Sequence, residues 1–77
     1  SASFIALNPP FHSGAALTDR VAPRMFADAA RVLRPGGQLW CVWNSGMSYR
    51  PDLERIVGPT RQVSRGPKFT VTVSTRR

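Results

Sequence analysis

The chain has 77 residues, of which 42% are hydrophobic, and its formal net charge is +7. This length allows one small domain at most, and the hydrophobic content excludes a disordered chain. The sequence contains no run of about 18 apolar residues and no signal peptide, so we expect no membrane partner. The positive charge favours a polyanionic partner such as RNA. However, ten of the eleven basic residues are arginine, a bias that a GC-rich genome would also produce.

The cysteine content is informative because Cys41 is the only cysteine. It excludes an intramolecular disulfide and a cysteine-based metal site, and we assign no metal ligands. Cys41 lies in an apolar run, so we expect a buried, inert thiol. Together with the missing signal peptide, this favours a cytoplasmic protein.

The first predicted element is a short strand over residues 4–7, an apolar run of the kind that is buried on both faces of a parallel sheet. Pro9 and Pro10 follow and stop the strand ladder. An amphipathic helix should come next. Pro23 is tolerated only in the first turn of a helix, which places the predicted start near Val21. Residues 35–37, Pro-Gly-Gly, should end this helix and turn the chain.

A second strand is predicted over residues 38–43, and with the first strand and the helix it forms a βαβ unit with parallel strands. Trp40 and Trp43 should lie on opposite faces of this strand, and we expect both to pack in the core. A short helix is predicted over residues 51–57. Its inward side chains should be Leu53, Ile56 and Val57.

The last predicted element is an antiparallel hairpin formed by residues 62–64 and 68–74 around the turn 65–67. Apolar residues alternate with polar ones along its second strand, which predicts a hairpin with the polar face in water. The apolar residues are Phe69, Val71 and Val73, and the polar ones are Lys68, Thr70, Thr72 and Ser74. We expect Arg76 and Arg77 to fray.

One loop carries a specific resemblance. Asn8-Pro9-Pro10-Phe11 at the end of an apolar strand resembles the signature loop of class I methyltransferases that modify planar amino groups. With His12 and the segment Leu33-Arg34-Pro35-Gly36-Gly37-Gln38-Leu39-Trp40, the chain is similar to the bacterial ribosomal RNA guanine-N2 methyltransferases. The catalytic part of those enzymes is called the methyltransferase small domain. Further residues that fit this subfamily are Asn44, Tyr49, Leu53, Phe69 and Val71.

The resemblance implies a catalytic role for Asn8 and Pro9. An exocyclic amine on a base is a poor nucleophile, because its lone pair is delocalised into the ring. The Asn8 side-chain oxygen and the Pro9 carbonyl would accept hydrogen bonds from its two N–H groups and so localise that lone pair. Substrate binding is implied for Pro10, Phe11 and His12. Phe11 would stack on a flipped-out base, Pro10 would stiffen the loop, and His12 would contact a substrate phosphate or hold the loop.

The resemblance also implies S-adenosylmethionine as the cofactor. The family binds it through a glycine-rich turn after its first strand and an acidic residue after its second, and this sequence contains neither. We therefore assign no cofactor-binding residue. Residues 1–77 are expected to be the C-terminal part of a methyltransferase catalytic domain that lacks the cofactor-binding half and is inactive alone.

The implied fold is α/β: the C-terminal half of a Rossmann-like, doubly wound sheet, with four strands, the last antiparallel, and two helices. The expected strand order is first, second, fourth, third. The first strand would then be an apolar edge, and we expect self-association there.

Two alternatives to guanine methylation stay open. The first is an adenine-N6 or protein glutamine methyltransferase, although those more often have tyrosine or tryptophan in place of Phe11. The second is a non-catalytic, basic RNA-binding module. It predicts exposed aromatic residues beside arginines on a face of the sheet.

Overall fold

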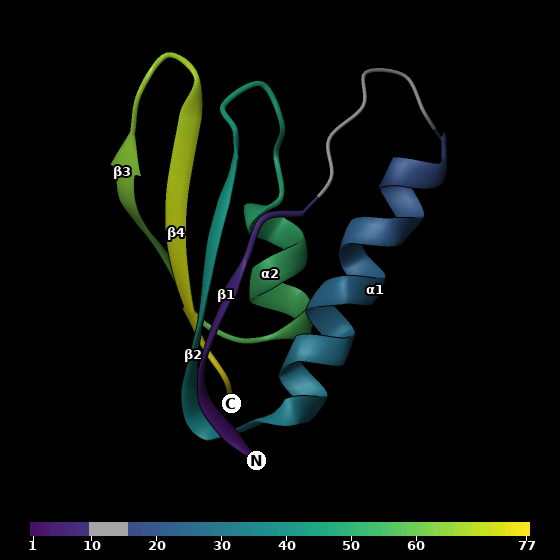
Figure 1. The fold of residues 1–77 in the computed structure, drawn as a ribbon, viewed down its shortest axis with the longest axis vertical. Coiled ribbons are helices and arrows are strands. Elements are labelled where there is room, and N and C mark those ends of the chain that lie inside the picture. Colours follow the sequence, from purple (N-terminus) through teal and green to yellow (C-terminus); the bar gives the residue numbers. More distant parts are fainter. Residues whose placement is uncertain (10–15) are drawn as a thin grey trace.

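The chain folds into one four-stranded sheet with two helices on the same face (Figure 1). A computed structural model describes residues 1–9 and 16–77, with side chains for residues 1–9 and 21–77. The elements in chain order are β1 (Ala2–Leu7), α1 (Ala16–Val32), β2 (Leu33–Asn44), α2 (Arg50–Ile56), β3 (Thr60–Arg65) and β4 (Phe69–Thr75). In this part of the chain, no helix is long and apolar enough to cross a membrane.

The strand order is β1-β2-β4-β3. β1 and β2 are parallel, whereas β4 is antiparallel to both of its neighbours, β2 and β3. The predicted α/β fold, strand order and antiparallel last strand are therefore confirmed. β1 pairs only with β2 and forms one edge of this sheet, as expected.

The predicted start of the first helix is wrong. α1 begins at Ala16 rather than near Val21, so Pro23 lies inside the helix. A proline in a helix interior removes one backbone donor and costs about 3 kcal/mol. Ala22 and Phe26, on either side of Pro23 in the sequence, are fully buried against the sheet, and their burial offsets this cost.

The predicted start of the second strand is also wrong. β2 begins at Leu33, directly after α1, instead of at Gln38. Ala2 pairs with Leu33 and Phe4 pairs with Gln38, so β2 accommodates three extra residues in a bulge. Gly36, with φ of +86°, lies in this bulge and adopts a conformation that a side chain would disfavour. The glycines thus bend a strand instead of separating a helix from one.

The C-terminus is held in place, contrary to the expected fraying. The Gly36 N–H donates to the Arg76 carbonyl (2.8 Å), and the Arg76 N–H donates to the Gly37 carbonyl (2.9 Å). The Arg77 N–H donates to the Val57 carbonyl (3.2 Å), and its guanidinium donates to the Glu54 carbonyl (2.8 Å). These bonds tie the last residues to the β2 bulge and to the end of α2.

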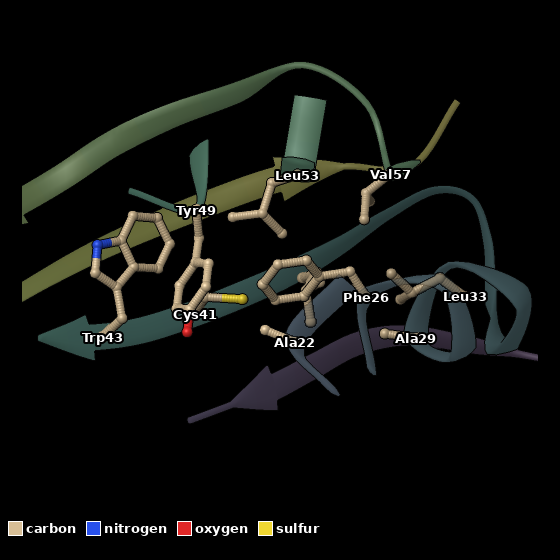
Figure 2. Close-up of a cluster of buried hydrophobic side chains, with 10 residues drawn as sticks. Ala22, Phe26, Ala29, Leu33, Cys41, Trp43, Tyr49, Leu53 and Val57 are labelled. Atoms are coloured by element: carbon tan, nitrogen blue, oxygen red, sulfur yellow. The ribbon is translucent and has the colours of Figure 1, made fainter. Parts of the chain in front are cut away.

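The hydrophobic core lies between the helices and one face of the sheet, which we call the helix face (Figure 2). It contains Ala22, Phe26, Ala29, Leu33, Leu39, Cys41, Trp43, Tyr49, Leu53 and Val57. Cys41 is fully buried, and burial raises the pKa of its thiol to about 12, which confirms the predicted buried thiol. The predicted inward residues of α2, Leu53 and Val57, are also confirmed, and Ile56 is partly buried.

The predicted wet face of β4 is wrong, because its polar side faces the helices. Thr70, Thr72 and Ser74 are 3%, 1% and 0% exposed. They pair across the ladder with Trp43, Cys41 and Leu39 respectively, so they share the helix face with that part of the core. The register with β2 therefore fixes the orientation of β4 regardless of which of its faces is more polar.

Neither helix covers the opposite face of the sheet, which we call the open face. Its residues include Phe4, Trp40, Arg61, Val42, Phe69 and Val71. Phe4 is 59% exposed, and its ring centroid lies 6.4 Å from that of Trp40. Trp40 and Trp43 point to opposite faces as predicted. Only Trp43 packs in the core, so the prediction that Trp40 does so is wrong.

Candidate active site

The predicted catalytic residues lie at the carboxyl end of β1. Asn8 directly follows the strand and is exposed, whereas Pro9 is fully buried. Pro9 therefore fixes the chain against the protein interior, and its neighbour Asn8 is presented to solvent. Ligands of open α/β sheets bind at this edge, beyond the carboxyl ends of parallel strands.

The three predicted substrate-binding residues, Pro10, Phe11 and His12, lie outside the described residues. Their roles stay predictions. The structure thus locates the first two residues of the loop and the edge of the sheet on which it begins.

Aromatic rings support this edge from within the core. Tyr49 is the N-cap residue of α2 and is only 5% exposed. Its ring centroid lies 5.7 Å from those of Phe26 and Trp43, with edge-to-face geometry in both pairs (Figure 2). Such pairs contribute about 0.5–1.5 kcal/mol beyond their buried area. They connect α1, the end of β2 and the start of α2 into one rigid support.

The hairpin between β3 and β4 reaches the same edge and is held there by Ser45, the residue after β2. The Ser45 N–H donates to the Lys68 carbonyl (2.8 Å), and the Ser45 hydroxyl donates to the Gly66 carbonyl (2.8 Å). The hydroxyls of Ser45 and Thr70 also share a hydrogen bond (2.9 Å). Ser45 was not among the residues predicted from the sequence. Its position directly after a predicted strand end was the available signal.

Three acidic residues lie among those whose side chains the structure describes. All three lie on the helices, and each forms an ion pair with an arginine. The pairs are Asp28–Arg31 (2.9 Å), Asp52–Arg55 (3.0 Å) and Glu54–Arg50 (3.6 Å). No group of His, Cys, Asp and Glu in the described ranges could hold a metal ion.

A shallow pocket lies on the open face, among Gln38, Pro59, Thr60, Arg61, Val73 and Thr75. Gln38 and Thr75 form a ladder pair near the amino end of β2, whereas Asn8 follows the carboxyl end of β1. Because β1 and β2 run parallel, this pocket is at the opposite end of the sheet from the predicted catalytic loop. It does not contribute to that site.

Strand order, an antiparallel β4 and an Asn-Pro pair after the first parallel strand together define the class, an α/β methyltransferase sheet. Comparison with known proteins identifies the family. The chain belongs to the methyltransferase small domain family, whose model matches residues 1–73. The resemblance inferred from the loop is therefore confirmed.

Similar proteins act on ribosomal RNA. The chain is 46% identical over 77 residues to ribosomal RNA large subunit methyltransferase G of Streptomyces griseus, and 43% identical over 75 residues to that of Magnetococcus marinus. It covers 20% of each of these relatives, about one fifth of their length. A solved structure, the T. thermophilus 16S rRNA N2-guanine methyltransferase in complex with AdoMet and guanosine, matches with a TM-score of 0.82. That match is 36% identical and covers 97% of this chain and 20% of the other.

Proposed function

We propose that residues 1–77 are the catalytic C-terminal part of an S-adenosylmethionine-dependent methyltransferase that methylates an exocyclic amine, N2 of guanine in ribosomal RNA. The observation that carries this proposal is the position of Asn8, exposed at the carboxyl end of β1 beside the buried Pro9. The relatives' names support ribosomal RNA as the substrate, and the guanosine in the solved neighbour supports the base.

Two acceptors from this chain would activate the amine. The Asn8 side-chain oxygen and the Pro9 carbonyl each accept a hydrogen bond from one N–H group of the amine. These two hydrogen bonds draw the nitrogen toward a tetrahedral shape and localise its lone pair. Both oxygens then lie where positive charge develops as the amine attacks. Because Pro9 is fixed by burial, little reorganisation is needed at the moment of reaction. The cofactor, when bound, supplies the electrophilic methyl group.

Among the residues that the structure describes, we find none that would form the cofactor site. Gly36 and Gly37 lie in the bulge near the amino end of β2, away from Asn8, and the described carboxylates are paired on the helices. We therefore infer that the cofactor-binding half belongs to a longer polypeptide and that residues 1–77 alone are inactive. The exposed apolar side chains of β1 and β2 on the open face, Phe4 and Val42, support this inference, since a doubly wound sheet has helices on both faces.

The test is methyl transfer to ribosomal RNA by the longer protein that contains this chain. Asn8→Ala should lower kcat by about 100-fold or more, as the loss of one fixed electrostatic contact does in other enzymes. Arg31→Ala, on the exposed side of α1, is the control and should retain activity. Nucleoside analysis of the product should give N2-methylguanosine. Unchanged activity of Asn8→Ala would contradict the catalytic role.

The same experiment separates the alternatives. An N6-methyladenosine product, or methylation of a protein glutamine, would replace guanine as the target and leave the role of Asn8 intact. The non-catalytic module predicts exposed aromatic rings beside arginines, and Phe4 and Trp40 on the open face with Arg61 match that pattern. Val42 and Val71 lie among them, however, and aliphatic side chains favour packing against protein over stacking on bases.

A further inference from the structure

We propose that the tip of the β3–β4 hairpin is an RNA-contacting site beside the catalytic loop, where Arg65 and Lys68 bind phosphates and Phe69 stacks on a base. This inference rests on the proposed function, because it places RNA at the Asn8 edge. It adds three residues outside the predicted loop to the substrate site. The hairpin tip is defined as residues 65–69.

The ladder register places the hairpin tip at the Asn8 edge. Leu7 pairs with Cys41, Asn44 pairs with Phe69, and Arg65 pairs with Thr70. Strands lie about 4.8 Å apart and rise about 3.3 Å per residue, so Phe69 lies about 10 Å across the sheet from Asn8 and about 7 Å beyond it. In Figure 1 the hairpin turn, the turn after β2 and the end of β1 point toward the same end of the molecule. A nucleotide near the target base would reach this tip.

The charges of the hairpin tip are available for a ligand. Arg65 and Lys68 are exposed, and neither forms an ion pair with a described residue. Arg65 donates one long hydrogen bond to the Ser45 carbonyl (3.4 Å), which leaves its charge uncompensated. The three ion pairs of the described chain instead neutralise arginines on the two helices. The hairpin tip therefore favours an anionic partner over a second copy of the same cationic chain.

The hairpin tip also presents an aromatic ring. Phe69 is 48% exposed, so its side chain is not required by the core. By the ladder register Phe69 pairs with Asn44 and lies on the open face, Lys68 directly precedes it, and Arg65 pairs with Thr70 and lies on the helix face. An RNA strand that passes over the end of the hairpin would place a base on the Phe69 ring and phosphates on the cations, the combination by which proteins bind single-stranded nucleic acid.

The tip is held rigidly enough to position these groups. Ser45 binds the Gly66 and Lys68 carbonyls and the Thr70 hydroxyl, as described above, and the Gly66 N–H donates to the Phe69 carbonyl (2.8 Å). Ser45 itself directly follows β2, the strand next to β1. The hairpin tip and Asn8 are thus attached to the same pair of parallel strands.

The experiment measures binding of a labelled single-stranded RNA of about eight nucleotides, within the usual site size, to the 77-residue chain by fluorescence anisotropy over a range of salt. Arg65→Ala and Lys68→Ala should each weaken binding about three- to tenfold at low salt and reduce the salt slope by about 0.7. Arg34→Ala is the matched control, since Arg34 is also exposed and forms no ion pair with a described residue but lies near the amino end of β2. It should weaken binding less than about twofold.

Phe69→Leu tests stacking, because it keeps an apolar side chain at this half-exposed position. It should weaken RNA binding about tenfold, corresponding to about 1.4 kcal/mol, without changing the salt slope. Binding of inorganic polyphosphate, which has no bases, should be unaffected by Phe69→Leu and weakened by Lys68→Ala. Thermal unfolding of each variant confirms that it is folded.

Three results would overturn the site: no RNA binding by the chain, equal losses for Arg34→Ala and the hairpin variants, or an unchanged affinity of Phe69→Leu for RNA. The assay needs no cofactor and no methyl transfer, so it is independent of the proposed chemistry. If Asn8→Ala keeps methylating while the hairpin variants lose RNA, the catalytic proposal fails and the hairpin site stands. If Asn8→Ala is inactive while the hairpin variants bind normally, the hairpin site alone fails.

Discussion

Gly58 lies between α2 and β3, where the backbone approaches β4 closely. A Cβ atom at this position would lie 2.0 Å from the Thr75 carbonyl oxygen, and the Gly58 φ angle is +157°. Gly58→Ala should therefore destabilise the protein by about 3 kcal/mol or more, because backbone atoms must move apart. Urea unfolding followed by the fluorescence of the buried Trp43 measures this change.

Gly36→Ala is the control for Gly58→Ala. Gly36 also has a positive φ, +86°, but no atom lies within 4 Å of the position that a Cβ would occupy there. Gly36→Ala should destabilise the protein by only about 1–2 kcal/mol, because alanine disfavours a positive φ but meets no close contact here. If the two variants lose equal stability, the close approach to Thr75 is not the reason why position 58 requires glycine.

Cys41 gives the fold a dependence on alkaline pH. Burial raises the pKa of its thiol from 9.0 to about 12, so the unfolded chain ionises before the folded one. The buried, protonated thiol therefore makes its full contribution to the free energy of unfolding below pH 9. As the pH rises from 9 toward 12, the free energy of unfolding falls by up to about 1.4 kcal/mol per pH unit, because the unfolded state loses the proton first. Cys41→Ala should unfold with a shallower pH dependence over this interval. Equal slopes for the two proteins would refute the assignment.

At the residue scale, the sequence predicts residues that a local pattern marks and misses those that depend on contacts with distant residues. A strand-ending Asn-Pro pair is a local pattern, so Asn8 and Pro9 could be predicted as catalytic residues. The structure places them after β1, and their catalytic roles stay predictions. Ser45 and the hairpin tip could not, since their role depends on hydrogen bonds between residues about 20 positions apart. Such contacts have no local signature in the sequence.

At the scale of elements, β4 presents its polar side to the helices, and one of its hydroxyls lacks a partner. The Thr60 and Ser74 hydroxyls share a hydrogen bond (2.7 Å), whereas the buried Thr72 Oγ1 has no partner among the described residues. Thr72→Val should therefore stabilise the protein by about 1 kcal/mol, since it removes an uncompensated desolvation cost. Denaturant midpoints at constant m value measure the change.

Thr70→Val is the control on the same strand and face. It removes the hydrogen bond between Thr70 and Ser45 and should destabilise the protein by about 0.5–1.5 kcal/mol. A loss of stability in Thr72→Val comparable to that in Thr70→Val would show that the Thr72 hydroxyl is satisfied in solution.

The errors in the predicted elements share a physical cause. Periodicity located the four strands and two helices of the described residues. However, the start of β2 and the inward face of β4 depend on strand pairing, and α1 includes Pro23 because the neighbouring side chains are buried. The register between β2 and β4 places Thr72 opposite Cys41, on the buried helix face. The valines of β4 therefore face the other side of the sheet, although they are the more apolar residues. Pairing with β1 likewise extends β2 through the Pro-Gly-Gly segment.

At the scale of the whole molecule, helices cover only one of the two faces of the sheet. α1 connects two parallel strands and α2 connects β2 to the hairpin, yet both pack on the helix face (Figure 1). The sequence indicates two amphipathic helices, but only the topology shows that they share a face. Phe4, Val42 and Phe69 remain between 37% and 59% exposed on the open face. This apolar surface, next to the free edge of β1, makes association of the isolated chain the expected behaviour.

Self-association should therefore depend on protein concentration and proceed through the edge strand β1, whose six residues carry no charge. Sedimentation equilibrium measures it. Because each chain carries a charge of +7, added salt should strengthen association by screening the repulsion, the opposite of its effect on RNA binding.

Phe4→Lys should shift the chain toward monomer, since a lysine on an edge strand opposes pairing. Val32→Lys is the matched control, because Val32 is also half exposed (48%) but lies at the end of α1. Equal effects of the two substitutions would show that net charge, and not the β1 edge, governs association.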